Sequence, residues 1–123
     1  MTVSEAEIQE QVVKLLDITL PNGSLLHHSP NEGMHKPHYR QKQIRQGLQS
    51  GWPDLEIFVQ PTWFLEGVRW STIFIEMKSE KGRVSDKQKE VLEMLDRIGC
   101  YTQVCRSLTE VLDFLRGLIK LKC

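Results

Sequence analysis

Residues 70–78 read WSTIFIEMK, an apolar run that ends in a glutamate and a lysine. The apolar part predicts a largely buried strand. Side chains alternate between the two faces of a strand, so Glu76 and Lys78 share one face and Met77 lies on the other. Burying charges costs free energy unless they are paired or bind a metal. The charged end of this strand is therefore a candidate functional site.

A third charge, Asp54, begins a second apolar run at residues 54–59. If the two runs pair as strands, Asp54 meets Glu76 and Lys78 at one spot. Two carboxylates suit Mg²⁺ or Mn²⁺, which take oxygen ligands, and Met77 could add only its backbone carbonyl. A neighbouring lysine would stabilise charge or orient a water molecule. These residues predict a metal-dependent phosphodiesterase centre.

Composition sets the class of protein. The chain has 123 residues, of which 40% are apolar, and this is sufficient for one domain spanning residues 1–123. No apolar run approaches the roughly 18 residues that span a membrane, and the first residues lack the pattern of a secretory signal. Three cysteines without paired spacing fit a reducing compartment. We therefore expect a cytoplasmic protein that is neither secreted nor bound to a membrane.

Periodicity and capping patterns predict helix, strand, basic helix, strand, strand, helix, strand, helix. A helix between two strands implies a parallel, right-handed crossover. The expected fold class is α/β (α+β), with a mixed sheet of about four strands flanked by helices. The expected strands are residues 24–29, 54–59, 68–78 and 101–106, and the helices begin at the capping boxes Ser4–Glu7, Ser85–Gln88 and Ser107–Glu110.

Two helical residues have alternative roles. Glu5 lies on the core-facing stripe at the start of the first helix, where it is either a partner of the helix dipole or a member of the site. Gln88 is the expected capping partner of Ser85, and it also heads the apolar stripe formed with residues 91, 92, 95 and 98. The role favoured for Glu7 is capping, although the sequence leaves open whether Glu5 or another first-helix acid completes the site.

A basic segment precedes Asp54. Residues 33–49 contain no acid, although the formal net charge of the chain is zero. The segment is either a solvated face or a contact to DNA phosphates. Its cationic residues are Lys36, Arg40, Lys42 and Arg45. Four histidines, at positions 27, 28, 35 and 38, have no cysteine partner or usual zinc spacing, so phosphate contact or surface exposure is favoured over a zinc site.

The motifs resemble those of a known family. Pro53-Asp54 followed by Glu76-Met77-Lys78 resembles the PD-(D/E)xK nuclease superfamily, whose core is similar to that of restriction endonucleases. Further motifs in the same order closely resemble the virus-type replication-repair nuclease (VRR-NUC) domain in a stand-alone form. These motifs are Glu5–Gln9, Pro30–Gly33, Gly51–Leu55, Ile75–Lys78 and Gly82–Gln88.

The resemblance implies roles for individual residues. Asp54 and Glu76 would bind Mg²⁺ or Mn²⁺, with Glu5 as the first-helix acid. Lys78 would be the catalytic lysine, and Gln88 would line the site. Asn31 joins the candidate DNA contacts. Met77 stands where the family often has leucine, which leaves the backbone carbonyl unaffected.

The resemblance also implies a biological setting. It favours a DNA endonuclease selective for branched DNA such as four-way (Holliday) junctions. The expected enzyme acts as a homodimer in DNA repair, in a bacterial or phage-infected cell. The alternatives are a restriction-type or single-strand- or flap-directed nuclease, a catalytically silent nucleic-acid-binding module, and a structural protein in which Glu76 and Lys78 form a simple ion pair.

Overall fold

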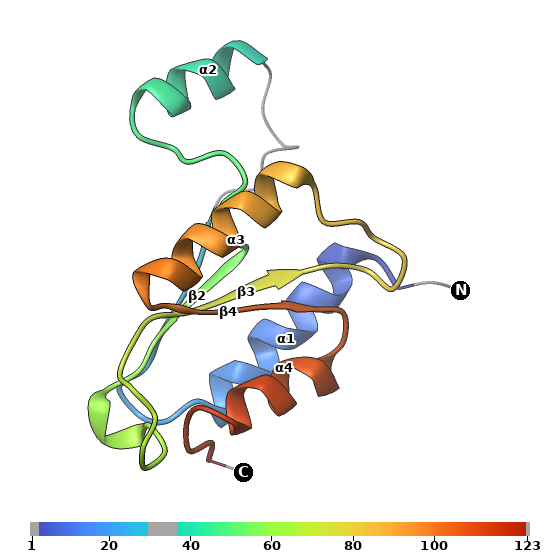
Figure 1. Ribbon diagram of the computed structural model, residues 1–123. Helices are drawn as coiled ribbons and strands as arrows, with labels where there is room; N and C mark the ends of the chain where they lie inside the picture. The colour runs from blue at the N-terminus through green and yellow to red at the C-terminus, as the bar shows by residue number, and fades with distance from the viewer. Residues whose placement is uncertain (1–2, 30–36, 123) are drawn as a thin grey trace.

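The chain forms a four-stranded sheet between two layers of helices. The computed structural model describes residues 3–29 and 37–122, with side chains in the second segment described from residue 41 onward. Helices α1 and α4 cover one face of the sheet and α3 covers the other, while α2 lies apart from the sheet (Figure 1). The helices are α1 (Glu5–Thr19), α2 (Pro37–Arg45), α3 (Asp86–Ile98) and α4 (Leu108–Arg116), with a 3₁₀ turn, η2, at Pro61–Trp63.

The sheet is mixed, as the sequence predicts. The strands are β1 (Leu25–His28), β2 (Leu55–Phe58), β3 (Ile73–Met77) and β4 (Tyr101–Cys105), in the spatial order β1-β2-β3-β4. Strands β1, β2 and β3 pair antiparallel, whereas β3 and β4 pair parallel across the α3 connection. The α/β fold class expected from the sequence is therefore confirmed. The two central strands are β2 and β3. Glu76 lies in β3, and Asp54 and Lys78 adjoin these strands.

The apolar core lies mainly on the face covered by α1 and α4. Val12 and Leu16 of α1 and Val111 and Leu115 of α4 pack there against Ile73, Ile75 and Met77 of β3. On the other face, Val91 and Leu95 of α3 pack on Phe74. Alternation along β3 thus places Met77 in the main core and Glu76 on the α3 face. No helix in the described residues is both long and apolar enough to cross a membrane.

Side-chain caps begin three of the helices. The Ser85 hydroxyl accepts a hydrogen bond from the Gln88 backbone amide, and the Gln88 side-chain oxygen accepts one from the Ser85 backbone amide. These two bonds complete the predicted capping box. Ser4 and Ser107 also cap their helices, but the glutamate side chain three residues later does not bond to the backbone amide of the capping serine. The Glu7 carboxylate instead accepts a hydrogen bond from the Ser4 hydroxyl, and the Glu110 carboxylate accepts one from the Arg106 backbone amide. Gln88 is therefore the one capping partner that also faces the site.

Strand β3 is shorter than predicted. The sequence predicts a strand over residues 68–78 after a short connection, but β3 begins at Ile73. The backbone of residues 68 and 69 makes other hydrogen bonds, because the Val68 amide donates to the Leu65 carbonyl and the Arg69 carbonyl accepts from the Tyr101 hydroxyl. The long connection still returns the chain antiparallel to β2.

Two other residues refine the sequence interpretation. Ile98, predicted to lie on the apolar stripe, is 74% exposed and is not part of the small apolar cluster under α3. Cys105 is a core residue, and burial, followed by the negative charge of Glu110, raises the pKa of its thiol to about 12. The Cys105 thiol therefore stays protonated at neutral pH.

The loop between β3 and α3 is held by Arg106. One guanidinium nitrogen, Nη1, donates to the carbonyl oxygens of Ser79 at 2.8 Å and Gly82 at 2.6 Å, with Glu80 farther away at 3.4 Å. Charged hydrogen bonds to backbone carbonyls are stronger than neutral ones. Arg106 therefore fixes the connection between Lys78 and Gln88.

Replacing Arg106 with alanine is expected to lower the free energy of unfolding by about 1–3 kcal/mol, because buried carbonyl groups lose a charged donor. Urea denaturation measures this change. The matched control is Arg116→Ala, since Arg116 forms an exposed ion pair with Asp113 at 3.7 Å, worth less than about 1 kcal/mol. Equal decreases in the free energy of unfolding in the two variants would contradict a stabilising role for the hydrogen bonds from Arg106 to the loop.

Candidate metal centre

Asp54 enters the site through a tightly packed segment. Gly51 has a φ of +79°, and a Cβ at this position would lie 3.0 Å from the backbone of Lys87. Glycine therefore allows the segment to approach the start of α3. Trp52 then packs edge-on against Phe74, with ring centroids 5.4 Å apart. These contacts fix the chain immediately before Asp54.

The Asp54 carboxylate is locked to the end of β3. It is 7% exposed, and its Oδ2 accepts the Met77 amide at 2.8 Å. Met77 thus contributes its amide to the site as well as its apolar side chain to the core. The ligand role expected of the Met77 backbone carbonyl stays a prediction.

Glu76 is held on two sides. Its side chain is buried, its Oε2 lies 3.5 Å from the Lys78 Nζ, and the same oxygen accepts the Gln88 Nε2 at 3.2 Å. Lys78 is itself buried, and its amide continues the pairing of β3 with β4 by donating to the Cys105 carbonyl. Gln88 therefore has both roles considered for it, since it caps α3 and orients Glu76.

The start of α1 supplies a third carboxylate. Glu5 is half-buried, and one oxygen from each of Glu5, Asp54 and Glu76 lies within 4.8 Å of the other two. Within the described residues, these three acids are the group of three or more acids, histidines or cysteines that could hold a metal ion. The structure thus brings Glu5, for which the sequence left two roles open, to the same place as Asp54 and Glu76.

The electrostatics of the cluster are unfavourable when all three acids are ionised. Burial, followed by the charge and hydrogen bonding of Asp54, raises the pKa of Glu76 to about 9, against the opposing effect of Lys78. Burial also raises the pKa of Glu5, which Lys78 opposes and Asp54 reinforces. Three carboxylates and one ammonium leave two negative charges uncompensated.

This donor set fits a hard divalent cation. Mg²⁺ and Mn²⁺ take oxygen ligands, and a charge of +2 would balance the two uncompensated negative charges. Glu5, Asp54 and Glu76 are the residues that could hold the ion. Lys78, already close to Glu76, provides positive charge beside them without occupying a ligand position.

The basic segment is not brought into contact with the acids within the described residues. Lys42 and Arg45, at the end of α2, are exposed. Asn31 and Lys36 lie outside the described residues, and the Arg40 side chain is also outside the described part. The predicted DNA-binding role of this segment therefore stays a prediction.

One of the four histidines, His28, lies beside the site, and the sequence did not distinguish it from the other three. The Nδ1 atom of His28 lies 3.0 Å from the Asp54 carbonyl oxygen and 2.9 Å from the Gln9 Nε2. The register that pairs His28 with Leu55 brings this imidazole next to Asp54. Pairing register is the signal that would have identified it, and the sequence alone does not specify it.

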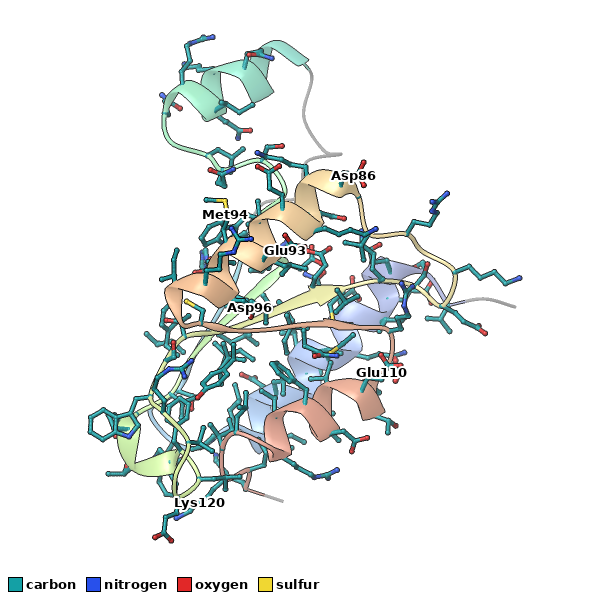
Figure 2. All side chains as sticks on the ribbon, viewed as in Figure 1. Asp86, Glu93, Met94, Asp96, Glu110 and Lys120 are labelled. Atoms are coloured by element: carbon teal, nitrogen blue, oxygen red, sulfur yellow. The ribbon has the colours of Figure 1, made fainter. Side chains whose placement is uncertain are left out.

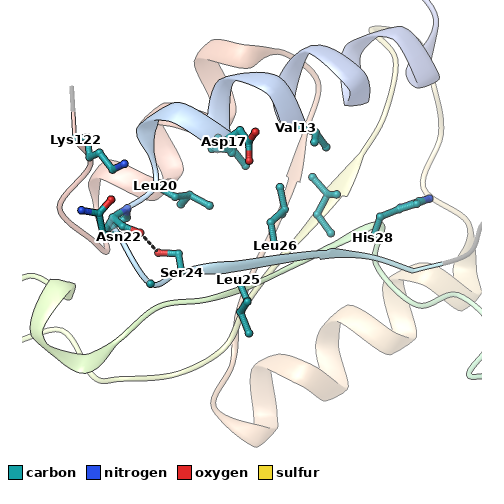
Figure 3. A pocket seen from close by; sticks show the side chains of 13 residues that line it. Val13, Asp17, Leu20, Asn22, Ser24, Leu25, Leu26, His28 and Lys122 are labelled. Atoms are coloured by element: carbon teal, nitrogen blue, oxygen red, sulfur yellow. Dashed lines mark hydrogen bonds between the residues drawn. The ribbon is translucent and has the colours of Figure 1, made fainter.

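A separate recess of about 400 Å³ lies between α1 and the edge strand β1. Its walls combine aliphatic side chains such as Val13, Leu20 and Leu26 with Asp17 and Lys122, and His28 lies at one end (Figure 3). None of the three clustered carboxylates lines this recess. The recess is therefore distinct from the metal centre.

Comparison with known proteins agrees with this arrangement. The VRR-NUC domain family model matches residues 5–108. A solved structure described as a VRR_NUC domain protein is 24% identical, with a TM-score of 0.69 over 94% of this chain and 88% of that chain. This similarity establishes a shared fold. A search of curated proteins finds no match.

Proposed function

The chain belongs to the VRR-NUC family of PD-(D/E)xK-type nucleases, and from this premise we propose that it is a Mg²⁺- or Mn²⁺-dependent deoxyribonuclease. The observation that carries the proposal is the convergence of Glu5, Asp54 and Glu76 beside the buried Lys78. A protein that only binds DNA has no use for buried acids that repel phosphate. The cluster therefore supports catalysis over silent binding.

The metal would supply Lewis acidity toward a phosphate oxygen and toward the attacking water. The chain's own residues would do the positioning. The Met77 backbone amide holds Asp54 in place, and the Gln88 side-chain amide donates a hydrogen bond to the Glu76 oxygen that faces Lys78. Preorganised groups of this kind need no rearrangement when charge develops in the transition state.

Lys78 would provide the positive charge nearest the reacting phosphate. Its Nζ is fixed by Glu76 at 3.5 Å and its backbone by β4, so the ammonium has little freedom to move away. A buried ammonium is also poorly screened by solvent, which strengthens its effect on developing negative charge. Lys78 is accordingly assigned to transition-state stabilisation or to orienting the water.

The preferred substrate is proposed to be branched DNA, such as a four-way junction, cut by a homodimer. The support is the resemblance of the motifs to junction-cutting relatives and the two-fold symmetry of such a junction, which two related active sites would match. We place this activity in DNA repair in the cytoplasm, a setting that agrees with the free thiols of Cys100 and Cys105.

The test compares end-labelled four-way junction, flap, single-stranded and linear duplex DNA, each with Mg²⁺, Mn²⁺ or EDTA. We expect cleavage with the metals, greatest on the junction, and none in EDTA. Preference for linear duplex would favour the restriction-type alternative, and preference for flaps or single strands the other nuclease alternative. Cleavage that persists in EDTA would refute the metal-dependent activity, and binding without any cleavage would favour the silent module.

A second experiment tests the basic segment. Replacing Lys36, Arg40, Lys42 and Arg45 with glutamine is expected to weaken DNA binding and to flatten its salt dependence. Each lost phosphate contact should reduce the slope of log K against log salt by about 0.7–0.9. Fluorescence anisotropy of labelled DNA over a salt series measures both the affinity and this slope.

The matched control removes two exposed charges elsewhere, at Lys14 and Lys120. This control should leave the slope as it is in the unmodified chain. An unchanged slope in the four-residue variant would remove the basic segment from the DNA contact surface.

A further inference from the structure

A second recess lies beside the metal centre, at the start of α3. Its volume is about 590 Å³, and its walls come from the loop after β3, the first turns of α3, and the end of β4. The side chains that matter here are those of Arg83, Lys89, Arg106 and Asp86. Asp86 marks the start of α3 in Figure 2.

The recess is electropositive. Three of its side chains are cationic and Asp86 is its one carboxylate, so the lining carries two net positive charges. Arg83 and Lys89 are exposed, and neither side chain forms an ion pair or hydrogen bond with another residue in the described segments. Their charges are thus available to a ligand, in a chain whose formal net charge is zero.

The recess is rigidly connected to the metal centre. Arg106 ties the Ser79 and Gly82 carbonyls together, and Ser79 directly follows Lys78. On the helical side, Lys89 directly follows Gln88, whose amide contacts Glu76. These two links place the recess on the side of the metal centre where β3 ends and α3 begins. A nucleic-acid strand that crosses the acids can therefore continue past the recess.

We propose that this recess binds a phosphate group of the nucleic-acid strand that flanks the scissile phosphate, through Arg83 and Lys89. The inference rests on the proposed function, because it places the same substrate strand across both sites. It assigns to residues 82–89, which include the end of the loop and the first turn of α3, a role in substrate binding in addition to the positioning of Gln88. Arg106 shapes the recess, and its hydrogen bonds to the loop make it a positioning residue.

The test is a DNA-binding measurement that does not depend on cleavage. The Arg83→Gln, Lys89→Gln double variant is compared with the unmodified chain by fluorescence anisotropy in Ca²⁺ over a salt series. Loss of one phosphate contact should lower the salt slope by about 0.7–0.9. Lys120→Gln is the control, because Lys120 is exposed and lies at the opposite end of the molecule from Asp86 (Figure 2). Thermal unfolding verifies that the variants are folded.

A scan of the DNA locates the phosphate. Single methylphosphonates, which are neutral, are placed on either side of the cleavage site, and oligonucleotides with a 5′-phosphate are compared with 5′-hydroxyl ones. At one position, the loss of the phosphate charge should weaken DNA binding by the unmodified chain severalfold and should have no effect on binding by the double variant. An internal position would identify a backbone diester, and dependence on the 5′ end a terminal phosphate.

Two results would overturn the proposal, and they are distinguishable. If the unmodified chain binds and cleaves DNA but the double variant keeps its salt slope and its methylphosphonate profile, the recess holds no phosphate while the proposed function stands. If the unmodified chain neither binds nor cleaves any DNA of the panel, the proposed function fails and the recess proposal fails with it.

Discussion

Replacing Glu76 with glutamine is expected to reduce metal-dependent cleavage by at least about 10³-fold. The change removes one of the three clustered carboxylates while keeping the size of the side chain. A metal ion contributes several kcal/mol of transition-state stabilisation, and a loss of about 4 kcal/mol corresponds to roughly 10³-fold in rate. Single-turnover cleavage of labelled DNA in Mg²⁺ measures the effect, and Asp54→Asn should behave similarly.

The control for this loss is Glu93→Gln. Glu93 is an exposed acid on α3 (Figure 2) and is not part of the cluster. Its replacement therefore removes the same charge from the α3 side of the sheet without removing a candidate ligand. Its activity should stay close to that of the unmodified chain. Substantial cleavage by Glu76→Gln or Asp54→Asn would place the metal centre elsewhere.

The metal-free protein is expected to lose stability as the pH rises from about 5 to 9. The pKa of Glu76 is about 9 in the folded chain and near 4.5 when the group is in its ordinary environment. Between these values the folded state holds a proton that the unfolded state has released. The unfolded state therefore binds fewer protons, so the free energy of unfolding falls with pH. The raised pKa of Glu5 acts in the same direction.

The size of this effect makes it measurable. Each pKa unit corresponds to about 1.4 kcal/mol, which shifts the melting temperature of a domain of this size by about 3–6 °C. Thermal unfolding in EDTA at a series of pH values tests it. Glu76→Gln should flatten the slope and melt at a higher temperature than the unmodified chain at pH 9. A melting temperature that rises from pH 5 to 9 in EDTA would contradict the raised pKa.

The predicted loss of cleavage in Glu76→Gln and the predicted loss of stability at high pH have one cause. Crowded, buried acids are costly without a cation, and removing one of them should stabilise the metal-free fold while abolishing the activity. Mg²⁺ or Mn²⁺ that binds the folded state alone should restore stability at high pH by mass action. A more stable but inactive Glu76→Gln protein would also exclude unfolding as the reason for its lost activity.

Local chemistry made much of the fold predictable. Capping by Ser4, Ser85 and Ser107 marked the helix starts, and the apolar runs marked β2 and the end of β3. The start of β3 was not predictable, because residues 68–72 (VRWST) include valine, tryptophan and threonine, which favour strands. Their backbone groups instead bond to distant parts of the chain, such as Tyr101.

The site was predictable where charge conflicted with burial. Asp54, Glu76 and Lys78 stood out because apolar runs placed charges in the interior, and Gln88 stood out because a cap position also faced the sheet. The sequence did not predict the place of His28 beside Asp54 or the role of Arg106 in the loop. Both are polar residues in ordinary surroundings, and their contacts depend on strand register and on the path of a loop.

The central claim is that Asp54, Glu76 and Glu5 hold a divalent cation beside Lys78. The most direct measurement is an anomalous difference map from crystals of the protein grown with Mn²⁺. We expect a peak bonded to carboxylate oxygens of Asp54 and Glu76, and no such peak in crystals of Glu76→Gln. A Mn²⁺ peak at other residues, or none between Asp54 and Glu76 at saturating Mn²⁺, would contradict the claim.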